Sequence, residues 1–254
     1  ATLSTNKSFE FVNYRTGFKP VNELILDSPF NYAEQTLVYI ASDMPEPTDE
    51  AGNYIIKLSR RILELIRISG GRTFVLFTSY DLLNKVYHLL EPLSFEFPLL
   101  RQGEHSTAKM IEKFKKKPSV ILGTSSFWQG VDIPGEALQS VIITKLPFDV
   151  PSEPIIEGRI EELRRKGVNP FYHYQLPRAI IQLKQGFGRL IRKRADRGVV
   201  SLLDPRLVNR SYGKQFIDSL PGGKLTDDFY EVKEFFKKMG CVQTYSEHDP
   251  NKII

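Results

Sequence analysis

The sequence predicts an α/β fold in which helices flank a mostly parallel central sheet. Two observations predict it. Short apolar runs alternate along the 254 residues with stretches of helical periodicity, as they do in repeated βαβ units. Several runs, among them TFVLF at 73–77 and SVIIT at 140–144, are continuously apolar and β-branched, which is typical of strands buried on both faces of a sheet.

The strands begin after residue 35. We expect them at Thr36–Ala41, Thr73–Thr78, Phe95–Arg101, Ser119–Gly123, Ser140–Leu146 and Val199–Leu203. The helical stretches keep apolar residues three or four positions apart, and we expect them at Tyr54–Ser69, Asp81–Leu90, Glu104–Lys116, Ser152–Lys166, Leu176–Lys193 and Phe229–Met239. Gly70 and Gly71 provide a stop after the first helix.

The two ends of the chain differ from this pattern. Residues 1–35 are polar and aromatic without a clear period, so we expect a linker there and one domain over residues 36–254. The chain starts with Ala in what reads as a loop, which predicts a processed or trimmed chain. The last residues are polar and are expected to fray.

Composition argues against several classes of protein. No run of about 18 apolar residues is present, and the N-terminus lacks the pattern of a secretory signal. The single cysteine, Cys241, excludes an internal disulfide and predicts a cytosolic protein. The four histidines lack metal-ligand spacing, so no metal site is predicted.

The net charge of +5 and the pI of about 9.1 suit a polyanionic partner. Basic residues cluster in two places: Lys113 with Lys115, Lys116 and Lys117, and Arg164 with Arg165 and Lys166. Solvated helix ends explain both clusters equally well.

The most informative stretch is QLKQGFGRLIRKRADR at 182–197. On a helix, Gln182, Gln185, Arg189 and Arg192 share one polar stripe. Two glycines, Gly186 and Gly188, cost a helix about 1 kcal/mol each, which favours close approach of a ligand or backbone over a plain surface helix. Arginine forks stabilise phosphoryl charge. GFG is not a dinucleotide fingerprint, because Ile191 replaces the third glycine.

A second stretch, GTSSFWQGVDIPG at 123–135, directly follows a buried strand. Loops at the carboxyl ends of strands carry ligand groups in α/β folds, and small hydroxyl residues and glycines allow backbone amides to reach phosphates. Phe127 and Trp128 would stack on bases or, more simply, pack. Asp132 is able to accept from a ribose hydroxyl or to join the outer shell of a metal.

The third stretch is GRTFVLFTSY at 71–80, a strand that ends in Thr78, Ser79 and Tyr80 before a helix. Hydroxyl groups and amides at a helix N-terminus donate readily to phosphates. An ordinary helix N-cap explains Ser79 equally well.

These stretches resemble motifs of DinG/XPD-type superfamily 2 helicases. QGFGRLIR at 185–192 is similar to motif VI (QxxGRxIR), GTSSFWQGVDIPG to motif V and VLFTSY at 75–80 to motif IV. SPFNYAEQ and KLPFDVPSEP are also typical of bacterial DinG-like helicases, and ATLS at the start resembles the end of the first motor lobe. The resemblance spans nearly the whole chain and implies the RecA-like second lobe of a P-loop-type motor.

The resemblance also implies roles for individual residues. Arg189 and Arg192 would be arginine fingers for ATP. Cofactor-binding positions would be Gln185, Gly188, Gly130 and Asp132. Single-stranded DNA would contact Thr78, Ser79, Thr124, Ser125 and, with weaker support, Lys145. ATP and Mg²⁺ would be shared with the first lobe of the same polypeptide, where any iron–sulfur cluster would also lie.

The sequence departs from the family at several points. Gln129 stands where many relatives have glutamate in motif V. No GxxxxGK[ST] loop is present, since GGKL at 222–225 has neither its spacing nor its hydroxyl residue, and Asp49-Glu50 lies in a polar stretch rather than after a strand. We therefore expect the second lobe of an ATP-dependent 5′–3′ DNA helicase of DNA repair or replication, inactive in ATP hydrolysis on its own. There are two alternatives. One is a non-catalytic nucleic-acid-binding module, and the other is the motor-like half of a DinG-type nuclease.

Overall fold

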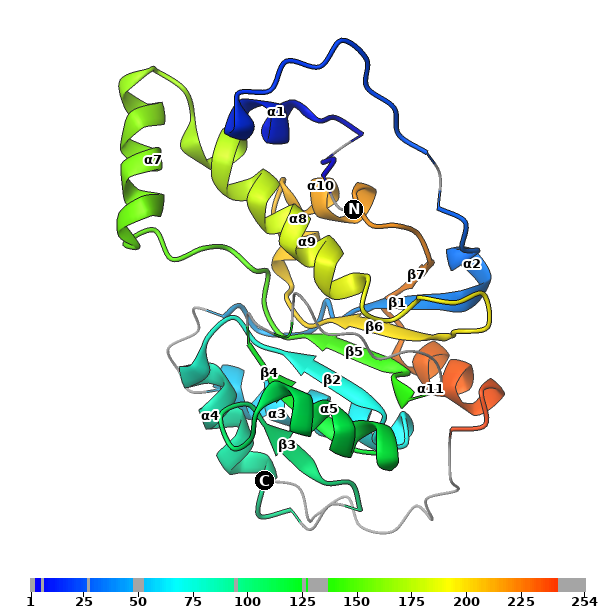
Figure 1. Ribbon diagram of the computed structural model, residues 1–254. Coiled ribbons are helices and arrows are strands. Elements are labelled where there is room, and N and C mark those ends of the chain that lie inside the picture. The colour runs from blue at the N-terminus through cyan, green and yellow to red at the C-terminus, as the bar shows by residue number, and fades with distance from the viewer. Residues whose placement is uncertain are drawn as a thin grey trace.

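The computed structural model describes residues 3–5, 7–26, 28–47, 53–93, 96–124, 127 and 137–241. Its strands form one parallel seven-stranded sheet in the order β3-β4-β2-β5-β6-β1-β7 (Figure 1). They are β1 (Thr36–Ile40), β2 (Thr73–Leu76), β3 (Leu99–Arg101), β4 (Val120–Gly123), β5 (Ser140–Ile143), β6 (Gly198–Leu202) and β7 (Lys224–Thr226). The predicted α/β fold class is confirmed.

Two strands differ from their prediction. β3 begins only at Leu99. β7 was not expected, because its three residues are too short for a periodic pattern and are largely exposed. Within the described residues this strand pairs only with β1, where Lys224 lies opposite Leu37, and it is the last strand at one edge of the sheet.

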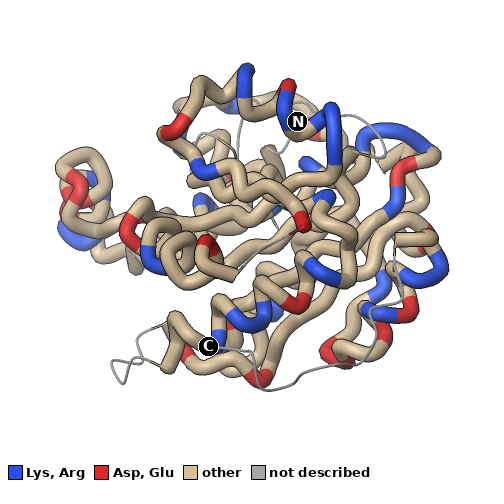
Figure 2. The backbone as a smooth tube through the Cα atoms, turned by 90° about the horizontal axis from the view of Figure 1, so that it is seen from below, with Lys and Arg blue, Asp and Glu red and all other residues tan. Residues whose placement is uncertain are grey.

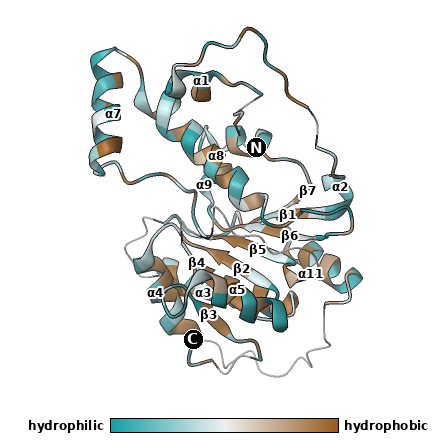
Figure 3. Ribbon diagram, in the orientation of Figure 1, coloured by the Kyte–Doolittle hydropathy of each residue, from teal (hydrophilic) through white to brown (hydrophobic). Residues whose placement is uncertain are grey.

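Helices cover both faces of the sheet, because alternate strand residues point to opposite faces. Val75 faces α3 (Asn53–Ile68), α4 (Tyr80–Leu90) and α11 (Phe229–Lys238). Phe74 and Leu76 face the opposite layer, which consists of α5 (Thr107–Lys116), α8 (Leu176–Phe187), α9 (Arg206–Asn209) and α10 (Gly213–Asp218). In Figure 3 the strands are largely brown, whereas the helices carry teal segments.

A small third cluster lies beside the sheet. It joins α1 (Glu10–Thr16), α7 (Pro154–Arg165) and a π-helical turn, η2 (Phe171–Gln175), which runs into α8. Phe11 of α1 packs against Ile160 and Leu163 of α7 and Tyr174 of η2. Figure 1 shows α7 standing apart from the sheet and a long arch running from α1 to α2 (Tyr32–Gln35). Residues 1–35 thus include helices that the sequence pattern did not reveal.

Charge is spread over the surface of the fold. Figure 2 shows Lys and Arg on many elements, with Asp and Glu between them. No helix within the described parts of the chain is both long and apolar enough to cross a membrane.

Candidate functional site

The helix that carries the start of QGFGRLIR is shorter than predicted. α8 ends at Phe187 with Gly188 as its C-cap, so the prediction that it runs to Lys193 is wrong. The N–H groups of Arg189 and Leu190 bond back three residues, to Gly186 and Phe187, which tightens the last turn. Arg189 and Arg192 therefore lie on a loop, at 188–197, that leads into β6.

Two buried polar side chains hold this loop. Asp196, 6% exposed, accepts hydrogen bonds at Oδ2 from the backbone N–H groups of Arg192 (2.9 Å) and Lys193 (2.8 Å). Gln35, 4% exposed, donates from Nε2 to the carbonyl oxygens of Lys193 (3.0 Å), Arg194 (3.2 Å) and Asp196 (2.8 Å). The end of α2 and the loop are thus locked together just before β1 and β6.

The predicted nucleotide-facing residues within the described chain come together at this point. Gln185 lies in the last turn of α8, Gly188 caps it, and Arg189 and Arg192 follow, all of them partly exposed. The other predicted members of this group, Gly130 and Asp132, lie outside the described residues. Both arginines thus lie on the loop at the amino end of β6, where Asp196 and Gln35 hold the backbone at 192–196.

The predicted DNA-facing residues lie at the carboxyl ends of the strands, a border of the sheet that we call the carboxyl edge. The arginine loop, at 188–197, lies at the opposite, amino ends. Thr78 and Ser79 follow β2, Thr124 follows β4, and Lys145 follows β5. Since β4, β2 and β5 are parallel neighbours, all four residues lie at their carboxyl ends. Ser125, the fifth predicted contact, lies outside the described residues.

Ser79 and Thr124 already have partners within the chain. Ser79 is the N-cap of α4, and its hydroxyl accepts from the N–H of Leu82 (3.2 Å), as the simpler interpretation predicted. Thr124 is 3% exposed, and both its N–H (2.6 Å) and its hydroxyl (3.1 Å) donate to Oε1 of Gln102. A phosphate would reach Thr124 only after Gln102 moves, whereas Thr78 is exposed.

Lys145 lies in a polar cluster at the ends of β5 and β6. Its ammonium nitrogen is 5.1 Å from the ring centroid of Tyr54, whose hydroxyl donates to the carbonyl oxygen of Thr144 (3.2 Å). Burial, with a contribution from the positive charge of Arg206, lowers the pKa of Lys145. The ammonium group of Lys145 thus lies over the ring of Tyr54 at the carboxyl end of β5.

Asp204 organises the same edge and was missed by sequence reasoning. It is 1% exposed, accepts from the N–H of Leu146 (2.8 Å) and forms a two-pronged ion pair with Arg206, whose Nη2 lies 2.6 Å from Oδ2. The signal was present in LLDPR at 202–206, a carboxylate placed directly after a buried strand. Asp196 and Gln35 were also missed, because their partners are backbone groups that no motif displays.

Phe127 packs and does not present its ring for stacking on bases. It is fully buried, and its ring lies edge-on to that of Phe74, with centroids 6.2 Å apart. A Cβ at Gly123 would come within 2.6 Å of the ring, so only glycine fits there. Trp128 lies outside the described residues. No group of three or more potential metal ligands occurs within the described parts of the chain.

The comparison with known families decides the assignment. Residues 62–223 match the family described as "Helicase C-terminal domain". This chain belongs to that family. The helicase domain is 43% identical over 238 residues to "ATP-dependent DNA helicase YoaA" of Haemophilus influenzae, which covers 93% of this chain and 37% of the relative. It is 37% identical to "3'-5' exonuclease DinG" of Bacillus subtilis over 229 residues, 87% of this chain and 25% of the relative.

The helicase domain thus spans between a quarter and two fifths of the length of these curated relatives. Its fold is also that of XPD: the structure "XPD_Helicase" aligns with a TM-score of 0.58 and 18% identity over 76% of this chain and 36% of that one. The resemblance to the second lobe of DinG/XPD-like helicases is therefore confirmed, as is the RecA-like fold.

Proposed function

We propose that this chain is the second motor lobe of an ATP-dependent DNA helicase, with residues 1–35 as the end of the first lobe and the linker and residues 36–254 as the lobe itself. The loop at 188–197 carries the proposal, because buried Gln35 and Asp196 fix the backbone from which Arg192 projects. A relative 43% identical that is named an ATP-dependent DNA helicase supports it.

In this proposal Arg189 and Arg192 face the phosphates of ATP across a cleft between two lobes. A guanidinium group offers a rigid fork of donors that stabilises the charge of a transferring phosphoryl group. Gln185 and Gly188, with Gly130 and Asp132, would lie near the nucleotide. Bound Mg²⁺ would neutralise phosphate charge, and its carboxylate ligands would come from the first lobe.

Single-stranded DNA would cross the carboxyl edge of the sheet, at Thr78, Ser79, Thr124, Ser125 and Lys145. Because the arginine loop and this edge lie at opposite ends of the short strands, one rigid lobe would connect the two sites. Closing and opening of the cleft would then move this DNA grip relative to the grip of the first lobe, in the 5′–3′ direction expected for the family.

The test is ATP hydrolysis with saturating single-stranded DNA, measured on this chain alone and on the chain mixed with the first lobe. We expect turnover only in the mixture, and a loss of about 10³-fold or more on Arg192→Ala. Arg194→Ala is the matched control, since this exposed arginine lies on the same loop. Turnover by the chain alone, or equal activity of the two variants, would refute the proposal.

The relative named an exonuclease favours one alternative, a lobe that serves a DinG-type nuclease. In that case Arg192→Ala in the parent protein would leave DNA cleavage intact while abolishing ATP turnover. The other alternative, a passive nucleic-acid-binding module, predicts no turnover in any mixture.

A further inference from the structure

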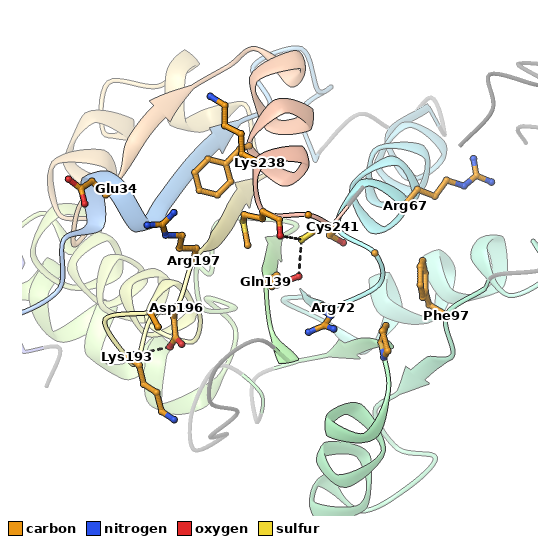
Figure 4. A pocket seen from close by; sticks show the side chains of 17 residues that line it. Glu34, Arg67, Arg72, Phe97, Gln139, Lys193, Asp196, Arg197, Lys238 and Cys241 are labelled. Atoms are coloured by element: carbon orange, nitrogen blue, oxygen red, sulfur yellow. Dashed lines mark hydrogen bonds between the residues drawn. The ribbon is translucent and has the colours of Figure 1, made fainter. Parts of the chain in front are cut away.

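A pocket of about 1010 Å³ lies at the amino ends of the strands. Its walls are the loops before β2, β5 and β6 and the end of α11, and Arg72, Gln139, Arg197, Lys238 and Cys241 are among its lining residues (Figure 4). Neither Arg189 nor Arg192 lines it, and the predicted DNA contacts lie at the opposite, carboxyl ends of the strands. The pocket therefore lies apart from the DNA edge, but it shares Lys193, Asp196 and Arg197 with the loop of the proposed ATP site.

Positive charge surrounds this pocket. Its lining holds five cationic side chains and two acidic ones, and the carboxylate of Asp196 is already bound by two backbone N–H groups. Four of the cations are exposed, and the described parts of the chain show no ion pair for them: Arg67, Lys193, Arg197 and Lys238. By contrast, several arginines at or near the opposite edge pair with carboxylates: Arg61, Arg178, Arg206 and Arg210.

The pocket also has an apolar wall. Phe97 is half-buried and lies close to Gly71, where a Cβ would be 2.3 Å from Cγ of the ring. Met239 and the half-buried thiol of Cys241 continue this wall, and the thiol donates to Oε1 of Gln139 (3.1 Å). In Figure 4, Arg72 lies between Gln139 and Phe97, and Arg197 lies across from them with its side chain directed toward Glu34.

We propose that this pocket binds a phosphate-bearing ligand of nucleotide size, with its phosphates among the cations and a planar group against Phe97. Unpaired cations at the mouth of a concave site bind phosphate by charge-assisted hydrogen bonds, and a half-buried aromatic ring accepts a base. The ligand is a free nucleotide or the end of a nucleic-acid chain, which present the same chemistry. The proposal goes beyond helicase function, because it requires neither ATP hydrolysis nor the DNA edge.

Cys241 provides a local readout. It is the only cysteine in the sequence and lines the pocket, so a bound ligand would shield it from alkylation by iodoacetamide, followed by intact mass. Burial raises the pKa of the thiol, so the reaction is run at alkaline pH, where thiolate forms. The probes are inorganic pyrophosphate, ADP and a short oligothymidylate, each titrated against the alkylation rate.

We expect saturable protection, with the half-protecting concentration raised about tenfold or more in Arg197→Gln/Lys238→Gln. The control is Arg164→Gln/Arg165→Gln, which removes the same charge from exposed positions on α7 and should shift that concentration by less than about twofold. Protection by pyrophosphate and ADP would identify a free nucleotide as the ligand, and protection by the oligonucleotide alone a nucleic-acid end. No protection by any probe, or equal shifts in both double variants, would overturn the proposal.

Discussion

The backbone nitrogen of Arg192 lies 2.9 Å from Oδ2 of Asp196, and this hydrogen bond turns the chain away from the axis of α8 before β6 begins. A second bond from the N–H of Lys193 to the same oxygen completes the turn. In a continuous helix these two N–H groups would instead donate to the carbonyl oxygens four residues earlier. The position of the arginine thus depends on a buried carboxylate four residues later.

We expect Asp196→Ala to lower the ATP turnover of the parent helicase by at least about tenfold, because Arg192 is unchanged in the sequence but is no longer held in position. The substitution leaves two N–H groups without their acceptor and should also reduce the free energy of unfolding by about 1–3 kcal/mol. Turnover and urea unfolding measure the two effects. Asp218→Ala, at an exposed position on α10, is the control, and an Asp196→Ala enzyme as active as this control would contradict the prediction.

Gln35→Glu should destabilise the chain. The amide group donates to three carbonyl oxygens, and a carboxylate would face the same oxygens without a donor. We expect a loss of about 1–3 kcal/mol in the free energy of unfolding, measured with urea. Glu34→Gln, the neighbouring exposed position, should change it by less than about 0.5 kcal/mol. Equal stabilities would show that the amide does not hold the loop.

Lys145→Gln should weaken binding of single-stranded DNA and reduce the slope of log K against log salt by about one. The reason is the loss of one cation from the carboxyl edge of the sheet. Lys214→Gln, at an exposed position on α10, should leave the slope nearly unchanged. Fluorescence anisotropy at several salt concentrations measures both, and identical slopes would remove Lys145 from the DNA site.

The same lysine should lower stability at neutral pH. Burial lowers its pKa in the folded protein, so the unfolded chain binds the proton more tightly. The destabilisation of the folded state by the charged lysine is complete below the pKa of the folded protein. It disappears as the pH rises to the pKa in the unfolded chain, about 10.4. Lys145→Met should therefore be more stable than wild type at pH 7, by a margin that narrows at alkaline pH. A margin that widens with pH would contradict this assignment.

Phe114→Ala should open a cavity under the sheet. The ring is 2% exposed, and its centroid lies 5.0 Å from that of Phe74. We expect a loss of about 3–5 kcal/mol in the free energy of unfolding, and a smaller loss for Phe114→Leu, which fills part of the space. Chemical denaturation measures the free energy of unfolding of both variants. A larger loss for Phe114→Leu than for Phe114→Ala would contradict the prediction.

The sequence by itself determined the α/β fold class, six of the seven strands, the longer helices and the family. Runs such as TFVLF and SVIIT are so apolar that only a sheet covered on both faces can bury them, and QGFGRLIR is a local motif that needs no tertiary information. The tertiary structure decided where α8 ends and what fixes the arginine loop. Local periodicity favours a helix through Arg192, but Gly188 and the carboxylate of Asp196 end it, with Gln35 reaching the loop from 158 residues away. Such long-range hydrogen bonds to backbone groups leave no periodic trace in a sequence, because any buried side chain with the right donor or acceptor can supply them.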